Sequence, residues 1–485
     1  MKVTLLNPTL MSGEKILRSE RCQVKLLVGI WPPIALAYIA AVLRREGIEV
    51  KIIDSVILDH TFEDMVEAIV EESPDLVIVQ NTTPTIYDDL EEAKIIKDLL
   101  PKVEIIFFGV HATARPQDIL NKDVKFAIRG EPEFTSLELC RCINDGKNDF
   151  ENIQGLSYFQ NGQIYHNPYR PPIFDLDILP FPARELLSTE KYLLPITKEP
   201  FTLLKTSRGC PYRCIYCTSI PYYGPRWRVR SAENIVAEIK EVIKKFNLSN
   251  FFFSSDTFNV RERHVVEICQ ELKKENLKIK WMCNSRVDNF SYETAKAMKE
   301  AGCWLVAFGI ESGSDLILKQ AKKGATVDQG EKAIEICKKV GIKSLCYFMF
   351  GLPGETQESI KKTLNFALKS KPDYVHFFAA TPFPGTEFFK MAEENGWLTS
   401  YDWRRYFHGM SDVISYPNLS AKEIAEATKF AYRKFYFRPQ RFIKELTSIR
   451  TLGDFVGRTE TFLNLIRTWI SRGTIIAKEK EDIGK

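Results

Sequence analysis

Three cysteines, Cys210, Cys214 and Cys217, follow one another with the spacing C-x3-C-x2-C. This spacing suits a tight loop around one inorganic cluster, in which three thiolates hold three irons of a [4Fe–4S] cube and leave the fourth iron open to a small ligand. A zinc loop would need a fourth Cys or His nearby, and the closest histidines in the sequence are His166 and His264. The spacing therefore predicts a cluster loop, with a purely structural cluster or a chance run of cysteines as the alternatives.

The composition is that of a soluble protein, with 45% hydrophobic and 27% charged residues in a chain of 485. This length predicts two or three domains with cores of their own. Lys+Arg 67 against Asp+Glu 63 leaves a net charge of +4, too small to indicate a nucleic-acid partner. Eleven cysteines, an odd number, together with a cluster loop indicate a reducing, anaerobic cytoplasm rather than a disulfide scaffold.

The first residues and one apolar stretch bear on membrane targeting. Lys2–Leu6 lacks the basic-then-apolar order of a signal peptide. The uncharged stretch Leu26–Leu43 is close to spanning length, but Pro32-Pro33 would break a spanning helix. We therefore predict a loop that ends at Pro33 and a helix over Ile34–Arg45.

Residues 1–150 alternate short apolar runs with amphipathic segments, a pattern typical of a doubly wound parallel sheet covered by helices on both faces. The expected strands are Lys2–Leu6, Val50–Asp54, Leu76–Gln80, Glu104–Gly109 and Val124–Ile128, and the expected helices are Ile34–Arg45, Thr61–Glu71, Tyr87–Leu99 and Pro116–Leu120. Ligands of such sheets bind at the carboxyl ends of the strands. Polar loops follow three successive strands there, at Asn81–Thr85, Gly109–Thr113 and Arg129–Glu133. Simple turn chemistry is the alternative explanation for these loops.

Residues 151–200 form a predicted connector. Leu156–Phe159 and Gln163–His166 flank Asn161-Gly162, which predicts a hairpin with a type I′ turn. The prolines that follow exclude a long helix or a central strand; they are Pro168, Pro171, Pro172, Pro180 and Pro182.

Residues 201–390 resume the strand–helix alternation with a longer period. Six strand–helix units predict a partial (β/α)6 barrel, whose chemistry gathers at the carboxyl ends of its strands. The expected strands are Thr202–Thr206, Asn250–Phe253, Lys280–Cys283, Trp304–Phe308, Ser344–Phe350 and Tyr374–Ala379. The expected helices include Ala232–Phe246, Arg261–Glu275, Tyr292–Ala301, Val327–Val340 and Gln357–Ser370.

Residues 391–485 lack strand character and are predicted to be helical, with one helix just before them at Phe388–Asn395 and another at Ser420–Arg438. In Thr451–Lys485 four apolar residues fall on one helical face, namely Phe455, Phe462, Ile466 and Trp469. This face either packs on the barrel, which we favour, or contacts a membrane surface.

The cysteine spacing after Arg208-Gly209, with the aromatic Tyr216 before the last cysteine, resembles the radical S-adenosylmethionine (SAM) superfamily. The front domain, with its three polar loops and the run Pro33–Tyr38 that opens a helix, resembles the cobalamin-binding domain of the B12-dependent class. Tyr401-Asp402-Trp403 and the following tail resemble relatives of the anaerobic magnesium-protoporphyrin monomethyl ester cyclase. The resemblance covers about residues 1–440.

The resemblance implies three cofactors: a [4Fe–4S] cluster, SAM and cobalamin. It implies that SAM is bound by residues at the barrel strand ends, namely Tyr216, Asp256, Asn284, Arg286, Glu311, Gly351 and Leu352. It places cobalamin near Pro33, Asn81, Thr82, Thr83, Gly109, His111, Gly130 and Glu131. The usual D-x-H-x-x-G source of a cobalt ligand is absent, so we expect no histidine on cobalt, with His111 as the one exception to test. For Glu311 and Glu355 the alternative is a charge at a helix N-terminus.

Such enzymes cleave SAM reductively to a 5′-deoxyadenosyl radical, and the resemblance implies a radical C-methylation of an unactivated carbon. The alternatives are ring closure or oxidation on a tetrapyrrole or lipid, and a non-catalytic cobalamin or cluster sensor. A methylthiotransferase would want a second cysteine trio in the front domain, where only Cys22, Cys140 and Cys142 occur. The sequence identifies neither a catalytic residue nor the substrate, although aromatic residues at 12% hint at a hydrophobic small molecule. A flavodoxin or ferredoxin is the expected reducing partner.

Overall fold

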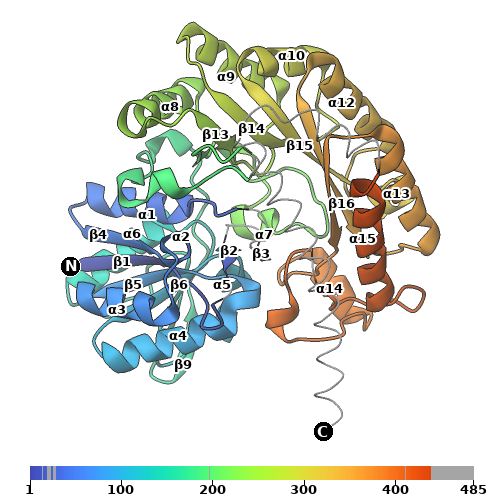
Figure 1. Cartoon of the computed structure of the whole chain (residues 1–485). Helices are drawn as coiled ribbons and strands as arrows, with labels where there is room; N and C mark the ends of the chain where they lie inside the picture. The colour runs from blue at the N-terminus through green and yellow to red at the C-terminus, as the bar shows by residue number, and fades with distance from the viewer. Residues whose placement is uncertain (14, 19–22, 26–28, 196, 410, 439–485) are drawn as a thin grey trace.

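The computed structural model describes residues 1–13, 15–18, 23–25, 29–195, 197–409 and 411–438. Two α/β bodies lie against each other, the N-terminal one in blue to teal and the second in green to orange (Figure 1). The predictions for Thr451–Lys485 lie outside the described residues.

The first body is built on a seven-stranded sheet with the order β4-β1-β5-β6-β7-β8-β9. Its strands are β1 (Lys2–Asn7), β4 (Glu49–Asp54), β5 (Leu76–Gln80), β6 (Glu104–Phe108), β7 (Phe126–Ile128), β8 (Leu156–Gln160) and β9 (Gln163–His166). The strands from β4 to β7 are parallel, which confirms the predicted doubly wound sheet. The strand order reverses between β1 and β5, and the carboxyl ends of these strands flank the crevice in which such folds bind ligands.

The β8–β9 hairpin differs from the prediction in its place. Asn161 and Gly162 have φ of 52° and 77°, as the expected type I′ turn requires. However, β8 pairs antiparallel with β7, so the hairpin belongs to the sheet and not to the connector. A free edge on β7 would expose unpaired backbone groups, which the hairpin covers.

Helices cover both faces of this sheet. They are α1 (Ile34–Arg45), α2 (Ser55–Leu58), α3 (Phe62–Glu72), α4 (Ile86–Leu99), α5 (Val110–Ala114) and α6 (Glu133–Asn144). The predicted helix α1 is confirmed, and it is buried from Ile34 to Leu43 because it lies between the two bodies. Just before it, Trp31 packs edge-on against Phe252 of the barrel, with ring centroids 4.8 Å apart.

Several short elements escaped prediction. The helix expected at Pro116–Leu120 is only a 3-10 turn, η2 (Pro116–Asp118). Helix α5 forms where a loop was expected, and α6 follows the expected loop Arg129–Glu133 in residues for which no element was predicted. A small hairpin of β2 (Ile16–Arg18) and β3 (Gln23–Lys25) was also missed. In the described part of the connector the helical elements are the 3-10 turns η3 (Leu176–Ile178), η4 (Arg184–Leu186) and η5 (Thr189–Lys191), and no long helix forms there, as its prolines predicted.

The second body is the predicted six-stranded partial barrel, with all strands parallel and in sequence order. Its strands are β10 (Thr202–Leu204), β13 (Asn250–Phe253), β14 (Lys280–Ser285), β15 (Cys303–Glu311), β16 (Lys343–Phe350) and β17 (Tyr374–Ala379). The outer helices are α8 (Ala232–Phe246), α9 (Glu262–Lys274), α10 (Tyr292–Glu300), α12 (Val327–Val340) and α13 (Gln357–Ser370). Near the cysteine loop lie the short helices α7 (Ser219–Tyr223) and α11 (Asp315–Gln320), and the paired strands β11 (Ser207–Arg208) and β12 (Arg228–Val229).

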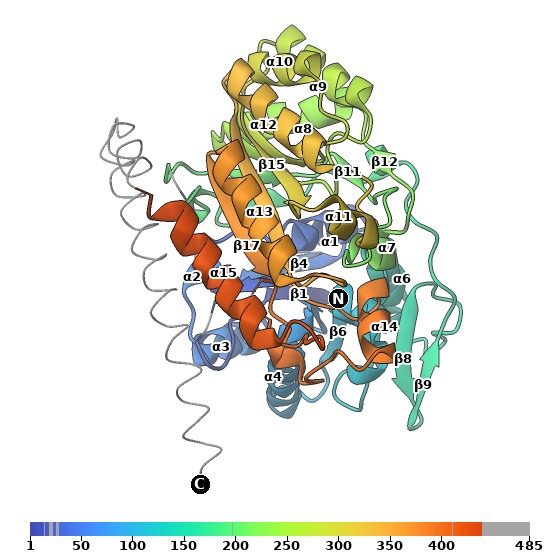
Figure 2. The same cartoon turned by 90° about the vertical axis from the view of Figure 1, so that its right-hand side faces the viewer.

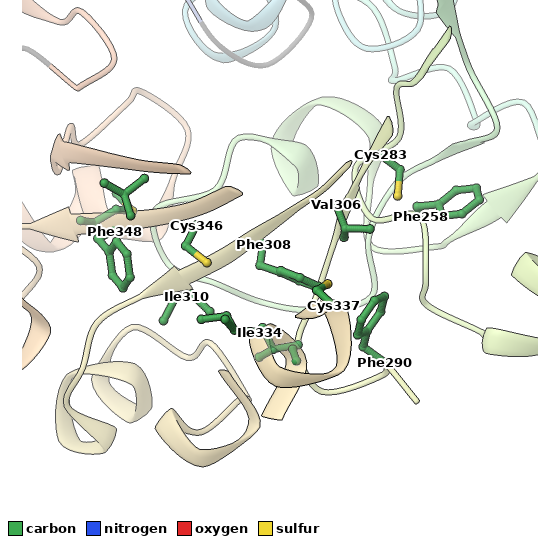
Figure 3. Close-up of a cluster of buried hydrophobic side chains, with 14 of the residues drawn as sticks. Phe258, Cys283, Phe290, Val306, Phe308, Ile310, Ile334, Cys337, Cys346 and Phe348 are labelled. Carbon is green, nitrogen blue, oxygen red and sulfur yellow. The ribbon is translucent and has the colours of Figure 1, made fainter. Parts of the chain in front are cut away.

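Alternation along the barrel strands separates a helix-facing core from an inner face. Figure 3 shows Phe308, Cys346 and Phe348 on the side of the strands where Ile334 and Cys337 of α12 lie. The residues between them on the same strands therefore face the interior of the barrel.

The C-terminal region holds α14 (Glu387–Glu394), η6 (Trp403–Arg405) and α15 (Ala421–Tyr436), which confirms both predicted helices. Figure 2 shows α15 running along β17, the edge strand of the barrel. The Tyr436 hydroxyl accepts a hydrogen bond from the Val375 amide at 3.1 Å and donates one to its carbonyl at 2.7 Å, so α15 satisfies part of the open edge. Among the described helices, none is both long and apolar enough to cross a membrane.

Candidate active site

The cysteine loop starts at a glycine that the geometry requires. Gly209 has φ of 78°, and a Cβ there would lie 2.2 Å from the Arg226 carbonyl oxygen. Its amide donates a hydrogen bond of 2.6 Å to Asp256. The loop is also held from behind, where the Ile215 amide donates to the Ala321 carbonyl at 3.1 Å. The backbone around Cys210 is thus fixed by groups from two other barrel loops.

None of the three thiols of the loop is in a disulfide, and each lies beside a hydrogen-bonding or cationic group. The Cys210 sulfur is 3.5 Å from the Thr257 hydroxyl, the Cys217 sulfur accepts from the Ser219 amide at 3.5 Å, and Arg286 Nη1 lies 3.9 Å from the Cys214 sulfur. Donors and cations of this kind stabilise thiolates. Among the described residues, no three Cys, His, Asp or Glu side chains lie close enough together to hold a single metal ion. The thiolates of a cluster bind separate irons, so their sulfur atoms do not need to lie that close to one another. The donor set fits a [4Fe–4S] cluster.

Arg286, a predicted SAM contact, makes several contacts within the protein, and its contact with SAM stays a prediction. Its guanidinium forms two hydrogen bonds to Asp288 at 2.8 and 2.9 Å, donates to the Lys323 carbonyl at 2.6 Å, and stacks on Tyr212 at 3.5 Å. Burial alone would lower the pKa of Arg286, but the hydrogen bonds and charge of Asp288 outweigh it and raise the pKa. These contacts occupy most of the donors and hold a permanent cation beside Cys214.

Glu311 forms a buried ion pair that the sequence did not reveal. Its Oε1 lies 2.9 Å from Lys323 Nζ, and both side chains are less than one tenth exposed. Glu311 has φ of 68°, a left-handed conformation that costs a non-glycine residue on the order of 1 kcal/mol and is typical of functional sites. Burial alone would lower the pKa of Lys323, but Glu311 and then Cys214 raise it. A carboxylate and an ammonium group therefore stand together next to the cysteine loop.

Two further predicted SAM residues carry unsatisfied polar atoms. The Asn284 amide oxygen and the Tyr216 hydroxyl are buried without a hydrogen-bond partner among the described residues. Burial raises the pKa of Tyr216, and the neighbouring Cys214 and Glu311 raise it further. Because buried polar atoms are normally paired, these two atoms fit a ligand such as SAM at the barrel mouth.

The other predicted SAM contacts are used within the protein. Asp256 binds the Gly209 amide and so positions the cysteine loop. At Gly351 the side chain of Ile424 of α15 would lie 2.9 Å from an added Cβ, and the predicted contact with SAM stays a prediction. Leu352 is fully buried. Glu355 accepts a hydrogen bond from the Gly351 amide at 2.5 Å, so the loop is braced by its own carboxyl.

At the carboxyl end of β5 the predicted cobalamin residues form a buried polar network. Asn81 accepts from the Ala112 amide at 3.2 Å, and the Thr82 and Thr85 hydroxyls are 2.9 Å apart. Gly109 has φ of 131°, and a Cβ there would meet the Asn81 carbonyl oxygen at 2.2 Å. Only glycine lets the ends of β5 and β6 come this close, so these loops form one surface at the end of the sheet.

An ion pair lies beneath this surface and was not predicted. Arg18 and Asp89 have fully buried side chains 2.8 Å apart. Arg18 also donates to the Thr85 hydroxyl at 3.1 Å and to the Gln80 carbonyl at 3.2 Å. The pair therefore fixes the loop that follows β5. Neither residue stands out in the sequence, because the pairing joins positions 71 residues apart.

His111 is enclosed by protein groups. Its Nδ1 lies 3.3 Å from the Thr83 hydroxyl and its Nε2 lies 3.5 Å from Asp118. The Trp403 ring packs edge-on against it at 5.4 Å. Burial lowers the pKa of His111, so the ring is held neutral. These contacts favour a structural role over a bond to cobalt.

Glu131, a predicted cobalamin contact, is held by groups of the second body, and its contact with cobalamin stays a prediction. Arg228 of the barrel donates to both of its oxygens, at 2.8 and 2.9 Å, and the Ile173 amide donates at 2.7 Å. Arg208, next to the cysteine loop, contacts Glu131 at 3.4 Å and Glu133 at 2.5 Å. The acidic loop after β7 thus holds the two bodies together.

Two predicted cobalamin residues keep a backbone role that fits the proposal. Gly130 donates its amide to the Thr113 hydroxyl at 3.0 Å and has φ of 78°. Pro33 is buried and precedes the first residue of α1. The contact of both residues with cobalamin stays a prediction.

Comparison with known proteins agrees with these sites. The model of the Radical SAM superfamily matches residues 204–367, and that of the B12 binding domain matches residues 22–139. An uncharacterized methyltransferase of Pyrococcus horikoshii is 36% identical over 89% of this chain and 94% of its own length. An anaerobic magnesium-protoporphyrin IX monomethyl ester cyclase of Rubrivivax gelatinosus is 26% identical over 84% of this chain and 74% of its own.

The solved structure of the cobalamin-dependent SAM radical enzyme OxsB shares the fold. It superimposes with a TM-score of 0.73, covers 96% of this chain and 72% of that one, and is 17% identical. At this sequence identity the similarity shows a shared fold of the two bodies and does not indicate a shared substrate.

Proposed function

Because the chain belongs to the radical SAM enzymes that carry a B12-binding domain, we propose that it C-methylates an unactivated carbon of a hydrophobic small molecule. The observation that carries this proposal is the buried cluster of Arg208 and Arg228 with Glu131 and Glu133. Arg208 lies two residues before Cys210, and the two glutamates follow the β7 end of the N-terminal sheet. The cluster therefore holds the thiolate loop and the crevice end of the sheet at one interface.

The proposed roles follow from the chemistry of each group. When bound, the [4Fe–4S] cluster, SAM and cobalamin supply the electron, the radical and the methyl group of the reaction. Cys210, Cys214 and Cys217 would hold the cluster. The carboxylate of Glu311 and the ammonium of Lys323 suit the amino and carboxylate groups of SAM, and Asn284 and Tyr216 would add neutral hydrogen bonds.

The chain also controls solvent and charge around the reacting groups. Arg286 holds a positive charge 3.9 Å from the Cys214 sulfur, where it would attract the negative charge of a bound cluster. Trp31 and α1 pack into the base of the partial barrel against Phe252 and Phe201, so water is excluded from that end. No general base is required of these residues.

Ring closure or oxidation of a tetrapyrrole is the second candidate. It is favoured by the similarity to the cyclase of Rubrivivax gelatinosus over most of this chain. The two outcomes differ in the fate of the SAM methyl group, since methylation places it in the product and cyclisation does not.

We further propose a small flavodoxin or ferredoxin as the electron donor and an anaerobic, reducing cytoplasm as the setting. Peripheral contact with a membrane through Thr451–Lys485 would bring the enzyme to an apolar substrate. Flotation of the full chain with lipid vesicles, compared with a chain that ends at residue 438, tests that contact.

The proposed function is tested with the anaerobically reconstituted chain, hydroxocobalamin, dithionite and SAM that carries a deuterated methyl group. With candidate extracts, methylation predicts a product that is heavier by the labelled methyl, together with S-adenosylhomocysteine and 5′-deoxyadenosine. Product formation without the label would favour the cyclisation candidate. Absence of both nucleoside products under all reducing conditions would contradict both.

A further inference from the structure

Four rings gather on one side of β16 and β17 and are not used by any site described above. Tyr347 and His376 are paired across the two strands, with centroids 5.9 Å apart and planes at 22°. Phe378 lies 5.7 Å from His376 with planes at 11°, and His408 lies 4.6 Å from Phe378. Three of these rings are close to parallel, which makes a flat aromatic wall.

This wall faces the interior of the barrel. On β16, Cys346 and Phe348 point to the helix layer (Figure 3), so Tyr347 between them points inward. Phe377 of β17 packs in the same outer core, which turns His376 and Phe378 inward. All four rings are half-buried, although each neighbouring core residue on the strands is fully enclosed. The wall therefore has accessible surface.

The segment that supplies His408 also reaches the N-terminal body. Five residues earlier, Trp403 donates from Nε1 to Asp118 at 3.1 Å and packs on His111. At the other end, Gly409 lies so close to Phe378 that an added Cβ would meet the ring at 2.3 Å. Residues 403–409 thus join the loop after β6 to the aromatic wall, so that the wall borders the proposed cobalamin end of the first sheet.

The wall also borders the proposed SAM site. Tyr347 is paired with Gly309 of β15. A Cβ at Gly309 would lie 2.4 Å from the Glu311 carboxylate and 2.8 Å from Lys323 Nζ, so the ion pair occupies the inner space above Gly309. Tyr347 and the Glu311–Lys323 pair are therefore neighbours within the barrel.

The two imidazoles of the wall are neutral. Burial lowers the pKa of His376 to about 4, as does the nearby His408, and burial lowers the pKa of His408 to about 4. His376 Nδ1 is bonded to the Tyr432 hydroxyl at 3.1 Å. For the His408 ring the described part of the chain provides no hydrogen-bond partner. A neutral imidazole with partly accessible surface and unused nitrogens can bind a polar atom or a metal centre of a ligand.

We propose that this wall binds the substrate, and that the substrate is a planar conjugated ring system stacked on Phe378 and Tyr347 with His408 as its polar contact. This inference rests on the proposed function, since it names the substrate class of that site. Flat rings bury large area against aromatic side chains and gain offset stacking, worth about 1 kcal/mol per ring pair. A wall of neutral groups also disfavours a charged group placed directly against its rings, since that group would lose its hydration without compensation.

The test is equilibrium binding of protoporphyrin IX to the full chain reconstituted with cluster and cobalamin, without reductant, followed by porphyrin fluorescence. We expect saturable binding to the wild type. Phe378→Leu and His408→Leu should each weaken it at least tenfold. Tyr292→Leu, which removes an exposed ring on α10 with 45% exposure, should leave it unchanged. Iron content and melting temperature establish that each variant is folded.

The proposal would be overturned if the wild type failed to bind the porphyrin, or if Phe378→Leu and His408→Leu both bound it as tightly as the wild type does. Displacement of the porphyrin by an equal concentration of cholesterol, an aliphatic polycycle, would overturn the requirement for a planar ring. This binding needs no reaction. If the wild type did not cleave SAM reductively, the proposed function would be contradicted. The porphyrin binding result would still decide whether the aromatic wall binds a planar ring.

Discussion

Arg228 donates hydrogen bonds to both carboxylate oxygens of Glu131, at 2.8 and 2.9 Å, and both side chains are at most 5% exposed. The pair joins β12, which lies near the cysteine loop, to the acidic loop of the N-terminal sheet. A buried pair of this kind contributes little net stability against water, but removal of one partner leaves the other charge uncompensated. The relative position of the two bodies therefore depends on this pair.

We predict that Glu131→Gln lowers the free energy of unfolding by roughly 3 kcal/mol, because Arg228 loses its anionic partner and Arg208 loses one of its two. Chemical denaturation of the full chain measures the change. Glu275→Gln, which removes the partner of the exposed Lys240, is the matched control and should change stability by less than about 1 kcal/mol. Equal effects of the two substitutions would contradict the special role of Glu131.

A second prediction concerns pH and Glu355, whose pKa burial raises from 4.5 to about 8. Between these two values the folded chain keeps a proton that the unfolded chain has lost. The stabilising effect of this proton is complete below pH 4.5 and is lost as the pH rises to about 8. Glu355→Gln should remove this dependence and stabilise the protein near pH 8 by on the order of 1–4 kcal/mol.

Denaturation between pH 5 and pH 8 checks this prediction. Glu358→Gln, in the exposed first turn of the same helix, should keep the wild-type decline. A decline that persists in Glu355→Gln would show that another group is responsible.

The third prediction concerns Lys323 and uses the adjacent Lys322 as its control. Lys323→Met leaves Glu311 unpaired and removes the ammonium group beside the proposed SAM site, so SAM cleavage should fall at least tenfold. Lys322→Met, which removes only an exposed pair with Glu387, should leave cleavage within about twofold. Release of 5′-deoxyadenosine is the measurement, with iron content as the control for cluster assembly. Equal rates in the two variants would refute the role of Lys323.

The fourth prediction concerns the ligand of cobalt. His111 is held by Thr83, Asp118 and Trp403, so we expect the cob(II)alamin form of the protein to show no nitrogen splitting from a histidine in electron paramagnetic resonance. His111→Ala should leave that spectrum unchanged. Nitrogen splitting that disappears in His111→Ala would place the imidazole on the metal.

Elements whose signal is local were predictable from the sequence. The six barrel strands and helix α1 follow from apolar runs, proline positions and caps, and the structure places them within a few residues of the expected bounds. Helices α5 and α6 were missed because they start directly after glycine or proline in loops, where turn chemistry and helix starts have similar residues. The place of the β8–β9 hairpin depends on the free edge of β7, which no local pattern records.

The cysteine loop was predictable for a similar reason, because its three ligands lie on one short segment. Partnerships between distant segments were not. Lys323, Arg228 and Arg18 are ordinary basic residues in the sequence, and each acquires its role only when the fold brings a buried carboxylate to it. The partners of Glu131 were not predictable either. Its place at a strand end suggested a ligand contact, and the fold brings Arg208 and Arg228 to it.

The most direct test of a cluster-dependent SAM enzyme compares the wild type with Cys210→Ala/Cys214→Ala/Cys217→Ala after anaerobic reconstitution. We expect the wild type to hold about four irons per chain and to release 5′-deoxyadenosine from SAM with dithionite. The triple variant should lose the iron and release none. Iron content and nucleoside release that are undiminished in the triple variant would contradict the assignment of the cysteine loop and the function built on it.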